Sequence, residues 1–407
     1  MKKTPELRFA GFDDEWTEQK LNEYLEPSKI KNFDNKYTKK DVLSVSGEFG
    51  IVNQIEFQGR SFAGEFVDNY GVVDTGDIVY TKSPLNSNPY GIIKYNPGKP
   101  GIVSTLYAVY KTKAANPSFV QTYFDLDKRL NDYLRPLVRK GAKNDMKVSS
   151  SDALLGKVIF PTVIEQQKIG IMLSKVDSLI ELKTKKLESL KSVKKSLLQK
   201  CFPKDGCKVP EMRFKGFTGD WKEKKVGEIA GYYYGGGTPK TSIEEYWNGN
   251  IPWIQSSDIK QDEFFDVKPK NFITKGAVKN SATKIIPARA IAVVTRVGVG
   301  KIALIEEDFT TSQDFLSFSQ IKIQETFALY ALYKLLQTEQ NEVQGTAIKG
   351  ITKDDLLNKT IVIPSDTVEQ QKIGQFFSKY DTLISLQQKE IDKLKIIKKS
   401  LLQKMFV

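Results

Sequence analysis

The stretch EQQKIGIMLSKVDSLIELKTKKLESLKSVKKSLLQK (165–200) decides the fold of this 407-residue chain, because residues 369–404 repeat its pattern. Both copies begin with EQQKIG and end with SLLQK, and both motifs recur after 204 positions. An internal repeat is interpreted before any local feature, since it sets the number and order of the domains.

Apolar residues in both stretches recur at alternating steps of four and three. This spacing is typical of the seam of a coiled coil. We therefore expect long helices at about 164–200 and 367–404 that pack against each other in antiparallel directions. The alternative is two amphipathic helices, each buried against its own domain. The seam residues are Ile169, Leu173, Val176, Ile180, Leu187, Leu190 and Leu197 in the first helix, and Ile373, Phe377, Tyr380, Ile384, Ile391, Leu394 and Leu401 in the second.

A second pair of motifs lies far upstream of these helices. PELRFAGFDDEW (5–16) recurs as PEMRFKGFTGDW (210–221), a shift of 205 positions. The chain therefore divides into halves of about 1–204 and 205–407, each with an opening segment, a mixed region and a lysine-rich helix. The mixed regions, about 17–160 and 222–363, match poorly, so a constant frame surrounds a variable content.

Short apolar runs in the mixed regions predict strands. GDIVYTK (76–82) and AIAVVTR (290–296) are β-branched runs that end in threonine and a cation. VIFP (158–161) and IVIP (361–364) predict closing strands that a proline ends. Two further segments have helical spacing of their apolar residues and are predicted counterparts of each other, FVQTYFDLDKRLNDYL (119–134) and FALYALYKLLQTE (327–339).

Composition favours a polyanionic partner and argues against catalysis. The 62 Lys and Arg residues exceed the 49 Asp and Glu residues, which gives a formal net charge of +13. Histidine is absent, so Cys/His zinc sites and Ser–His or Cys–His pairs are excluded. The two cysteines, Cys201 and Cys207, do not make a disulfide framework and indicate a reducing, cytoplasmic setting. We find no apolar run long enough to span a membrane and no signal core at the start.

Faint enzyme motifs fail on inspection. VGVGK (297–301) lacks the first glycine and the final Ser/Thr of a phosphate loop. Asn88–Pro89–Tyr90 is one proline short of the Asn-Pro-Pro-Tyr site of amino-methyltransferases. We find no pairing of carboxylates with lysine that supports a metal nuclease. The sequence therefore predicts a binding protein without a catalytic or metal site.

At this point the chain resembles the specificity subunits of Type I restriction–modification systems. GGGTPKTSIEEYWNGNIPWIQSSDI (235–259) resembles the start of a target-recognition domain, and GTAIKGITKDDLLNKTIVIP (345–364), followed by EQQKIG, resembles its junction with a spacer helix. The first half lacks the first signature but keeps part of the junction frame at 141–157.

The resemblance implies an α+β fold with two pseudo-repeated target-recognition domains, separated by two long helices in an antiparallel coiled coil. We expect a first recognition domain at 1–160, a central spacer helix at 161–204, a second recognition domain at 205–363 and a C-terminal spacer helix at 364–407. Each domain would read one half of a split DNA target.

The predicted DNA-binding residues are polar or glycine positions in turns and at strand ends, where function is commonly placed on a rigid scaffold. For any single position, an ordinary surface role is the alternative. In the first half they are Lys82, Asn86, Asn88, Tyr90, Ser104, Arg139, Lys140, Lys143 and Lys147. In the second half they are Gly236, Gly237, Thr238, Lys240, Arg296, Lys301, Thr311, Ser312, Gln313, Thr346 and Lys349. We expect the Gly236–Gly237 turn to let the backbone approach an anion, and the tryptophans at 247 and 253 to act as packing anchors.

The resemblance also implies the partners. These are double-stranded DNA, two methyltransferase subunits and motor-nuclease restriction subunits, with S-adenosylmethionine, magnesium and ATP held by the partners. The predicted partner-binding residues are Ile169, Leu173, Val176, Ile180, Ile373, Phe377, Tyr380 and Ile384. The alternative function is a coiled-coil adaptor that binds proteins through two sheet domains. Salt dependence separates the two functions, because phosphate contacts make affinity fall steeply with salt.

Overall fold

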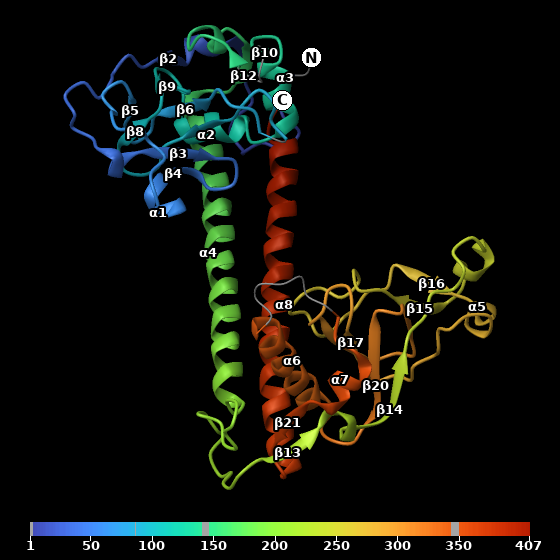
Figure 1. Ribbon diagram of the computed structural model, residues 1–407. Helices are drawn as coiled ribbons and strands as arrows, with labels where there is room; N and C mark the ends of the chain where they lie inside the picture. Colours follow the sequence, from blue (N-terminus) through green and yellow to red (C-terminus); the bar gives the residue numbers. More distant parts are fainter. Residues whose placement is uncertain (1–2, 86, 141–145, 343–349) are drawn as a thin grey trace. The chain divides into compact units, whose positions relative to one another are not determined.

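The computed structural model describes residues 3–85, 87–140, 146–342 and 350–407, with the side chains of Lys140, 146–147 and 339–342 outside the description. The chain forms two compact units. The first unit comprises Met1–Lys183 and Glu390–Val407, and the second comprises Thr184–Lys389. The long helices α4 (Val163–Cys201) and α8 (Thr367–Lys404) each contribute one part to both units (Figure 1).

Within each unit, a part of α4 and a part of α8 run side by side in opposite directions. In the first unit, Lys398 of α8 pairs with Asp177 of α4 at 2.7 Å. Further along α4, Lys183 pairs with Glu390 at 2.8 Å. In the second unit, Lys194 of α4 pairs with Asp381 of α8, and both side chains are buried. Positions 194 and 398 follow the four-and-three spacing of the seam but hold lysines. Each of these lysines has a carboxylate partner on the other helix.

The first unit is built on a four-stranded antiparallel sheet in the order β2-β9-β6-β7, with Ile78↔Tyr110 and Ile78↔Tyr95 in register. Three helices accompany the sheet, α1 (Gln54–Gln58), α2 (Pro117–Tyr123) and α3 (Asp127–Leu134). The core contains Trp16, Phe119 and Phe160. The strands of the main sheet are β2 (Leu25–Pro27), β6 (Ile78–Thr81), β7 (Ile93–Tyr95) and β9 (Tyr107–Thr112). The two-stranded pairs are β1 (Thr17–Lys20) with β12 (Lys157–Phe160), β3 (Leu43–Ser46) with β4 (Gly50–Asn53), β5 (Gly71–Val73) with β8 (Gly101–Val103), and β10 (Arg139–Lys140) with β11 (Met146–Lys147).

The second unit contains a four-stranded antiparallel sheet in the order β14-β20-β17-β18. Its core contains Trp221, Phe318 and Phe327. The strands of the main sheet are β14 (Ala230–Gly235), β17 (Ala290–Val294), β18 (Ile302–Ile305) and β20 (Phe315–Ile321). The other strands are β13 (Lys222–Lys225) paired with β21 (Thr360–Ile363), and β15 (Ile251–Ile254) between β16 (Asn271–Ile273) and β19 (Thr310–Thr311). The helices are α5 (Lys275–Lys279), α6 (Glu325–Glu342) and α7 (Lys353–Asn358).

Short 3-10 turns complete both units. They are Leu21–Glu23, Lys39–Asp41 and Asp152–Leu154 in the first unit, and Val226–Glu228 and Glu244–Trp247 in the second.

The two main sheets have the same strand order when β2, β9, β6 and β7 are matched with β14, β20, β17 and β18. The predicted strands at 76–82, 158–161, 290–296 and 361–364 are confirmed as β6, β12, β17 and β21. The predicted helix at 119–134 is wrong as one element, because α2 ends at Tyr123 and α3 begins at Asp127. Asp125 lies in the break between α2 and α3, where it forms ion pairs with Lys94 and Lys398.

The Arg-Phe-x-Gly-Phe segment is bound to the first turns of the long helix in each unit. Arg8 donates two hydrogen bonds to the buried carboxylate of Glu165, at 2.8 and 2.9 Å. Arg213 does the same to Glu369, at 2.7 and 2.9 Å. In both units the arginine keeps its pKa above the usual value, chiefly through the hydrogen bond to this glutamate. A bidentate pair fixes direction as well as distance, because the guanidinium and the carboxylate are both planar.

The second phenylalanine of this segment also meets the long helix. Lys168 lies 4.8 Å from the ring centroid of Phe12, and Lys372 lies 4.8 Å from that of Phe217. These cation–π contacts explain why a lysine recurs in EQQKIG.

The glutamine and glycine of EQQKIG hold the helix that follows the main sheet. Gln166 accepts from the backbone N–H of Asn116 just before α2, and Gln370 accepts from that of Gln324 just before α6. A Cβ on Gly374 would lie 2.2 Å from the hydroxyl oxygen of Thr326 at the start of α6. Only glycine permits this approach, and Gly170 stands in the same relation to Ser118.

We predict that Arg213→Ala lowers the free energy of unfolding of the second unit by about 3 kcal/mol or more. The reason is that the carboxylate of Glu369, which is 1% exposed, would remain buried without its cation. Guanidinium denaturation followed by tryptophan fluorescence measures this, because Trp221, Trp247 and Trp253 lie in the second unit.

The control is Lys204→Ala, which breaks an exposed pair with Glu211 in the same unit and should leave the midpoint unchanged. Equal midpoints for the two variants would contradict the structural importance of the buried pair.

Candidate nucleic-acid interface

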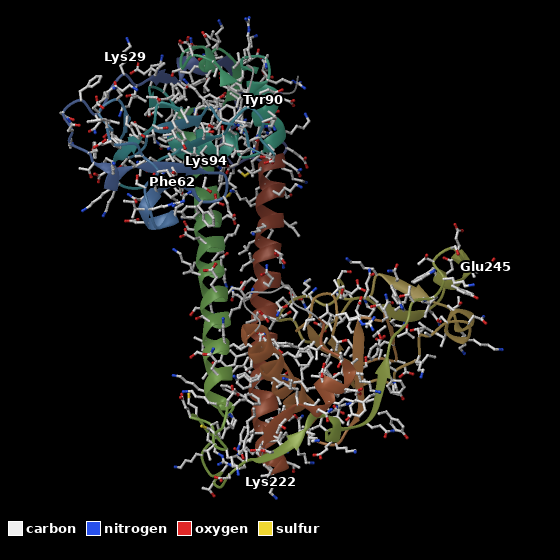
Figure 2. The ribbon with its side chains drawn as sticks, in the orientation of Figure 1. Lys29, Phe62, Tyr90, Lys94, Lys222 and Glu245 are labelled. Carbon is white, nitrogen blue, oxygen red and sulfur yellow. The ribbon has the colours of Figure 1, made fainter. Side chains whose placement is uncertain are left out.

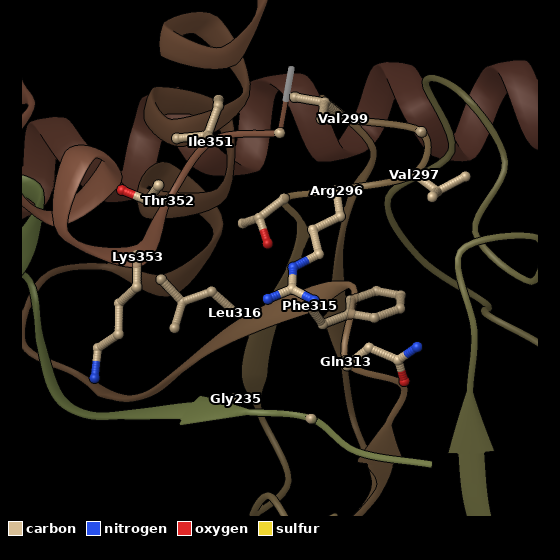
Figure 3. A pocket seen from close by; sticks show the side chains of 14 residues that line it. Gly235, Arg296, Val297, Val299, Gln313, Phe315, Leu316, Ile351, Thr352 and Lys353 are labelled. Carbon is tan, nitrogen blue, oxygen red and sulfur yellow. The ribbon is translucent and has the colours of Figure 1, made fainter. Parts of the chain in front are cut away.

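One edge of the second unit's main sheet brings several predicted residues together. β17 ends at Val294 opposite Phe315, where β20 begins, and β14 ends at Gly235 opposite Leu316. The loops that leave these strand ends therefore share one edge. A cavity of about 910 Å³ lies there, and predicted residues Gly236, Arg296 and Gln313 line it (Figure 3).

Arg296 is the central cation of this cavity. Its side chain is exposed and extends into the cavity beside Gln313 and Phe315 (Figure 3). The backbone before it is held on both sides, since Thr295 donates to the Asp314 carbonyl at 2.8 Å and accepts from the Ile351 N–H at 2.8 Å. Within the described part of the chain, no acceptor binds the guanidinium. Among the described residues, nothing competes with a ligand for its five N–H donors.

Gln313 and Thr238 form a polar pair at the same edge. The Thr238 hydroxyl donates to the Gln313 side-chain oxygen at 2.5 Å, and both residues are exposed. The amide NH₂ of Gln313 therefore points its donors elsewhere. Lys240, which follows in the same turn, is exposed, and its carbonyl accepts a hydrogen bond from the Trp247 ring N–H at 3.3 Å.

Lys301 makes a hydrogen bond within the protein, and its predicted DNA contact stays a prediction. Its ammonium donates to the Ser256 carbonyl at 2.9 Å and so ties the loop after β17 to the loop after β15. The tryptophans are packing anchors, as predicted. Trp253 donates to the Gly237 carbonyl at 3.0 Å, and its ring packs edge-on against Trp247.

The glycine turn packs closely against its neighbours, and the prediction that its backbone approaches an anion stays a prediction. A Cβ on Gly236 would lie 1.9 Å from the Ser312 carbonyl, and a Cβ on Gly237 would lie 2.5 Å from the Thr283 nitrogen. The Gly237 N–H is used by the Thr311 carbonyl at 2.9 Å. Thr311 and Ser312 are buried beneath this turn, so burial argues against a DNA contact by either side chain.

The predicted residues and the residues that line this edge do not coincide completely. Thr346 and Lys349 lie outside the described residues. Lys353 was missed by the sequence reasoning, although it lines the cavity at the start of α7 and is exposed (Figure 3). The signal was present, since Thr352 followed by Asp355 is a helix-start pattern two residues after Gly350.

The equivalent edge of the first unit carries Lys82. β6 ends at Thr81 opposite Tyr107, where β9 begins, and the Lys82 N–H donates to the Leu106 carbonyl at 3.1 Å. Lys82 is half-buried, and burial together with the nearby charge of Lys31 lowers its pKa. Lys31 is a second cation that the sequence reasoning missed, and no local motif marks it.

Ser104 and Tyr90 lie at this edge as well. The Ser104 carbonyl accepts from the Tyr107 N–H at 3.0 Å, and the Tyr90 carbonyl accepts from the Tyr80 hydroxyl at 2.7 Å. Both side chains are half-buried. Asn88 is buried and donates to Asp127 at 2.8 Å, so its role is structural and the DNA prediction for it is not supported. Asn86 lies outside the described residues.

Three of the predicted residues, Arg139, Lys140 and Lys147, lie on the antiparallel strands β10 and β11, with Arg139 and Lys147 in register. Arg139 is exposed and lines a second cavity of about 620 Å³. Lys143 lies outside the described residues, and for Lys140 and Lys147 only the backbone is placed. Figure 2 draws the described side chains of both units and labels Tyr90 and Lys94 in the first.

The described residues contain neither a metal-binding cluster nor a membrane-spanning helix. There is no group of histidine, cysteine, aspartate and glutamate residues there that could hold a metal ion. Across the same residues, none of the helices combines the length and the apolar character that crossing a bilayer requires.

Half of the predicted partner-binding residues are core residues. Ile169 and Leu173 are buried in the core of the first unit, and Ile373 and Phe377 in that of the second. A partner cannot reach them, because their own unit covers them. Val176, Ile180, Tyr380 and Ile384 are half-buried.

A different apolar set on the long helices is exposed. Its members occupy equivalent positions of the repeat and are 39–65% exposed. They are Ile164, Leu179 and Leu182 in the first unit, and Val368, Leu383 and Leu386 in the second. Ile164 and Leu182 are 18 residues apart, which is five helical turns, so they lie on one line along α4. We call these two sets the outer rows.

Comparison with known proteins shows first a similarity to one family. Residues 218–396 match the family model described as the Type I restriction modification DNA specificity domain. This confirms the resemblance that the sequence motifs indicated, over the second mixed region and most of the second long helix.

The particular relatives belong to the same class. The Type I restriction enzyme MjaIX specificity subunit of Methanocaldococcus jannaschii is 30% identical over 191 residues, which cover 46% of this chain and 44% of the relative. The Type I restriction enzyme EcoR124I/EcoR124II specificity subunit of Escherichia coli is 33% identical over 183 residues, or 42% and 43% of the two chains. The chain thus matches less than half the length of these curated relatives.

The fold is similar over almost the whole chain to that of a solved specificity subunit. The crystal structure of the Type I restriction–modification S subunit from M. genitalium aligns with a TM-score of 0.63 at 15% identity, covering 99% of both chains. A structure concerned with complex assembly and conformational transition of the type I R-M system aligns with a TM-score of 0.53 at 17% identity, covering 96% of this chain and 97% of that one.

We predict that Gly236→Ala destabilises the second unit by about 1–3 kcal/mol, because the new methyl would overlap the Ser312 carbonyl. Gly235→Ala is the matched control, since nothing lies within 4 Å of its Cβ position. Denaturant midpoints of the two variants measure the difference. An anion-binding turn would instead give two stable proteins of which Gly236→Ala alone binds DNA less tightly.

Proposed function

We propose that this chain is the DNA-reading specificity subunit of a Type I restriction–modification complex. The observation that carries the proposal is that two units with the same strand order hold cations at the same sheet edge. In the described part of the chain, the side chains of Lys82 and Arg296 have no hydrogen-bond acceptor or ion-pair partner there. A basic chain with unoccupied donors at loop-bearing strand ends is suited to phosphate and base edges.

In this proposal each unit reads one half of a split target, and α4 and α8 form an antiparallel coiled coil that separates the two readers. Support comes from the equivalent contacts inside the units. Lys194 pairs with Asp381 in one, and Lys398 with Asp177 in the other, at positions 204 residues apart. The four-segment division at 160, 204 and 363 stays a prediction.

The chain itself would catalyse nothing. Methyl transfer would be carried out by two methyltransferase subunits, and cleavage by motor-nuclease restriction subunits, in the cytoplasm. S-adenosylmethionine, magnesium and ATP would be held by those partners. Support for a non-catalytic chain comes from the absence of histidine in this sequence and from the relatives, which are named as specificity subunits of Type I restriction enzymes.

The outer rows are the surface that we assign to the methyltransferase subunits, in place of the seam residues. Their exposure leaves leucine and isoleucine in contact with water, and burying them in an interface would be favourable. They occur once in each unit at equivalent positions, which fits two copies of one partner.

The first test is a map of methylated adenines in a methylation-free host that expresses the full chain with its cognate methyltransferase subunit. Residues 222–344 are then exchanged for those of another family member. We expect a bipartite motif of which only one half changes, because each unit reads alone. An adaptor protein would give no methylation although both proteins are folded and associated.

A second test addresses the outer rows. We predict that Leu182→Glu with Leu386→Glu abolishes co-purification of the methyltransferase subunit, because each places a charge among the exposed leucines at one end of an apolar row. Thermal unfolding of the chain should not change, since both side chains are more than half exposed. Leu85→Glu, at an exposed leucine outside the long helices, is the control. Retained co-purification of the double variant would exclude the outer rows as the docking surface.

A further inference from the structure

A cation follows the equivalent strand of the main sheet in each unit. β6 and β17 are equivalent, because each is third in the strand order of its sheet. In the pairing register Thr81 matches Val294, and Lys82 matches Thr295, whose N–H groups donate to the residues just before β9 and β20. Lys82 is therefore the first residue after β6, and Arg296 is the second residue after β17. The two cations differ in kind and in position, as residues that read different sequences can.

Arg296 combines a fixed backbone with an exposed side chain, which is the arrangement that reading a base requires. Its backbone is fixed by the hydrogen bonds of Thr295 to Asp314 and Ile351, and its side chain enters a cavity from there. Gln313 lies beside it with its oxygen already accepting from Thr238 (Figure 3). The arrangement presents donors and no negative charge to a ligand. It therefore matches a ligand that offers two adjacent acceptors.

Neighbouring cations of the second unit are used differently. Lys301 is bound to the Ser256 carbonyl, and Arg289 at the other end of β17 is paired with Glu325. Lys240 and Lys353 are exposed on the rim and suit phosphate contacts. Among the described arginines and lysines of this edge, Arg296 alone combines a fixed backbone, a place in the cavity and an unoccupied side chain.

Lys82 is the cation that follows the equivalent strand in the first unit. Its backbone is fixed to Leu106 at the start of β9, and its ammonium is half-buried without a carboxylate in reach among the described residues. Burial and Lys31 lower its pKa, so the charged form is not stabilised by the protein itself. An acceptor on a ligand would supply that stabilisation.

We propose that the cation in the segment after this strand is a base-reading residue of each unit, and that Arg296 and Lys82 each select a guanine in their own half-site. Guanine presents O6 and N7 as adjacent acceptors in the major groove, and arginine or lysine is their most common partner. The inference rests on the proposed function, because it names the specificity-determining residues of the same surface.

The test uses the full chain with its cognate methyltransferase and a genome-wide map of methylated adenines. For Arg296→Ala, we expect one G·C position of one half-site to lose discrimination by about 10- to 100-fold, with the other half-site unchanged. Lys82→Ala should relax one G·C position of the other half-site. Arg289→Ala is the control and should give the wild-type motif, because Arg289 is committed to Glu325.

Arg296→Lys keeps the charge and loses the planar fork, so discrimination at that position should be intermediate. This variant also serves if Arg296→Ala does not fold. The fold of each variant is checked by thermal unfolding before the maps are compared.

Three outcomes would overturn the inference. An unchanged motif for Arg296→Ala shows that Arg296 reads no base. A uniform loss of methylation by a folded variant shows a phosphate contact, and relaxation at an A·T position shows a different base. Absence of any bipartite motif for the wild-type chain is a separate result, since it removes the proposed function together with the inference.

Discussion

The buried bidentate pair between arginine and glutamate is the constraint on which both units depend. Arg8 with Glu165 and Arg213 with Glu369 attach the opening segment of each unit to the first turn of a long helix. A carboxylate without exposed surface has to keep its cation, so the segment, the helix and the strand pair between them are fixed together. The glutamine and glycine next to the glutamate then fix the helix that follows the main sheet.

This clamp explains why one part of the sequence is repeated and another is free to vary. Most recurring positions of EQQKIG have a partner whose geometry tolerates little change, from the ion pair of Glu369 to the close approach of Gly374 and Thr326. Among the described residues, the side chains of Lys82 and Arg296 at the strand ends have no such partners. The strand ends can therefore carry different residues on the same scaffold.

Lysines in the seam of the long helices have a comparable purpose. Lys194 is buried between Asp381 and the aromatic rings of Phe264 and Tyr330, and burial raises the pKa of Asp381. A buried ion pair adds little stability over a hydrophobic contact but penalises any other register, because a shift would leave the charge alone. Lys398 with Asp177 imposes the same condition on the first unit.

The sequence by itself determined the long helices, the halves of the chain and the closing strands, because periodic apolar spacing and repeated motifs are local signals. It also marked Arg296 and Lys82, since a β-branched run that ends in threonine and a cation can be recognised without a structure. Only tertiary packing decided which of the predicted binding residues are exposed to a ligand or partner. Thr311, Ser312 and Asn88 are polar turn residues in the sequence, yet they are buried, and Ile169 and Phe377 are seam residues whose own unit covers them. Burial depends on segments far apart in the chain, so no local pattern separates a polar residue that supports a turn from one that reaches a ligand.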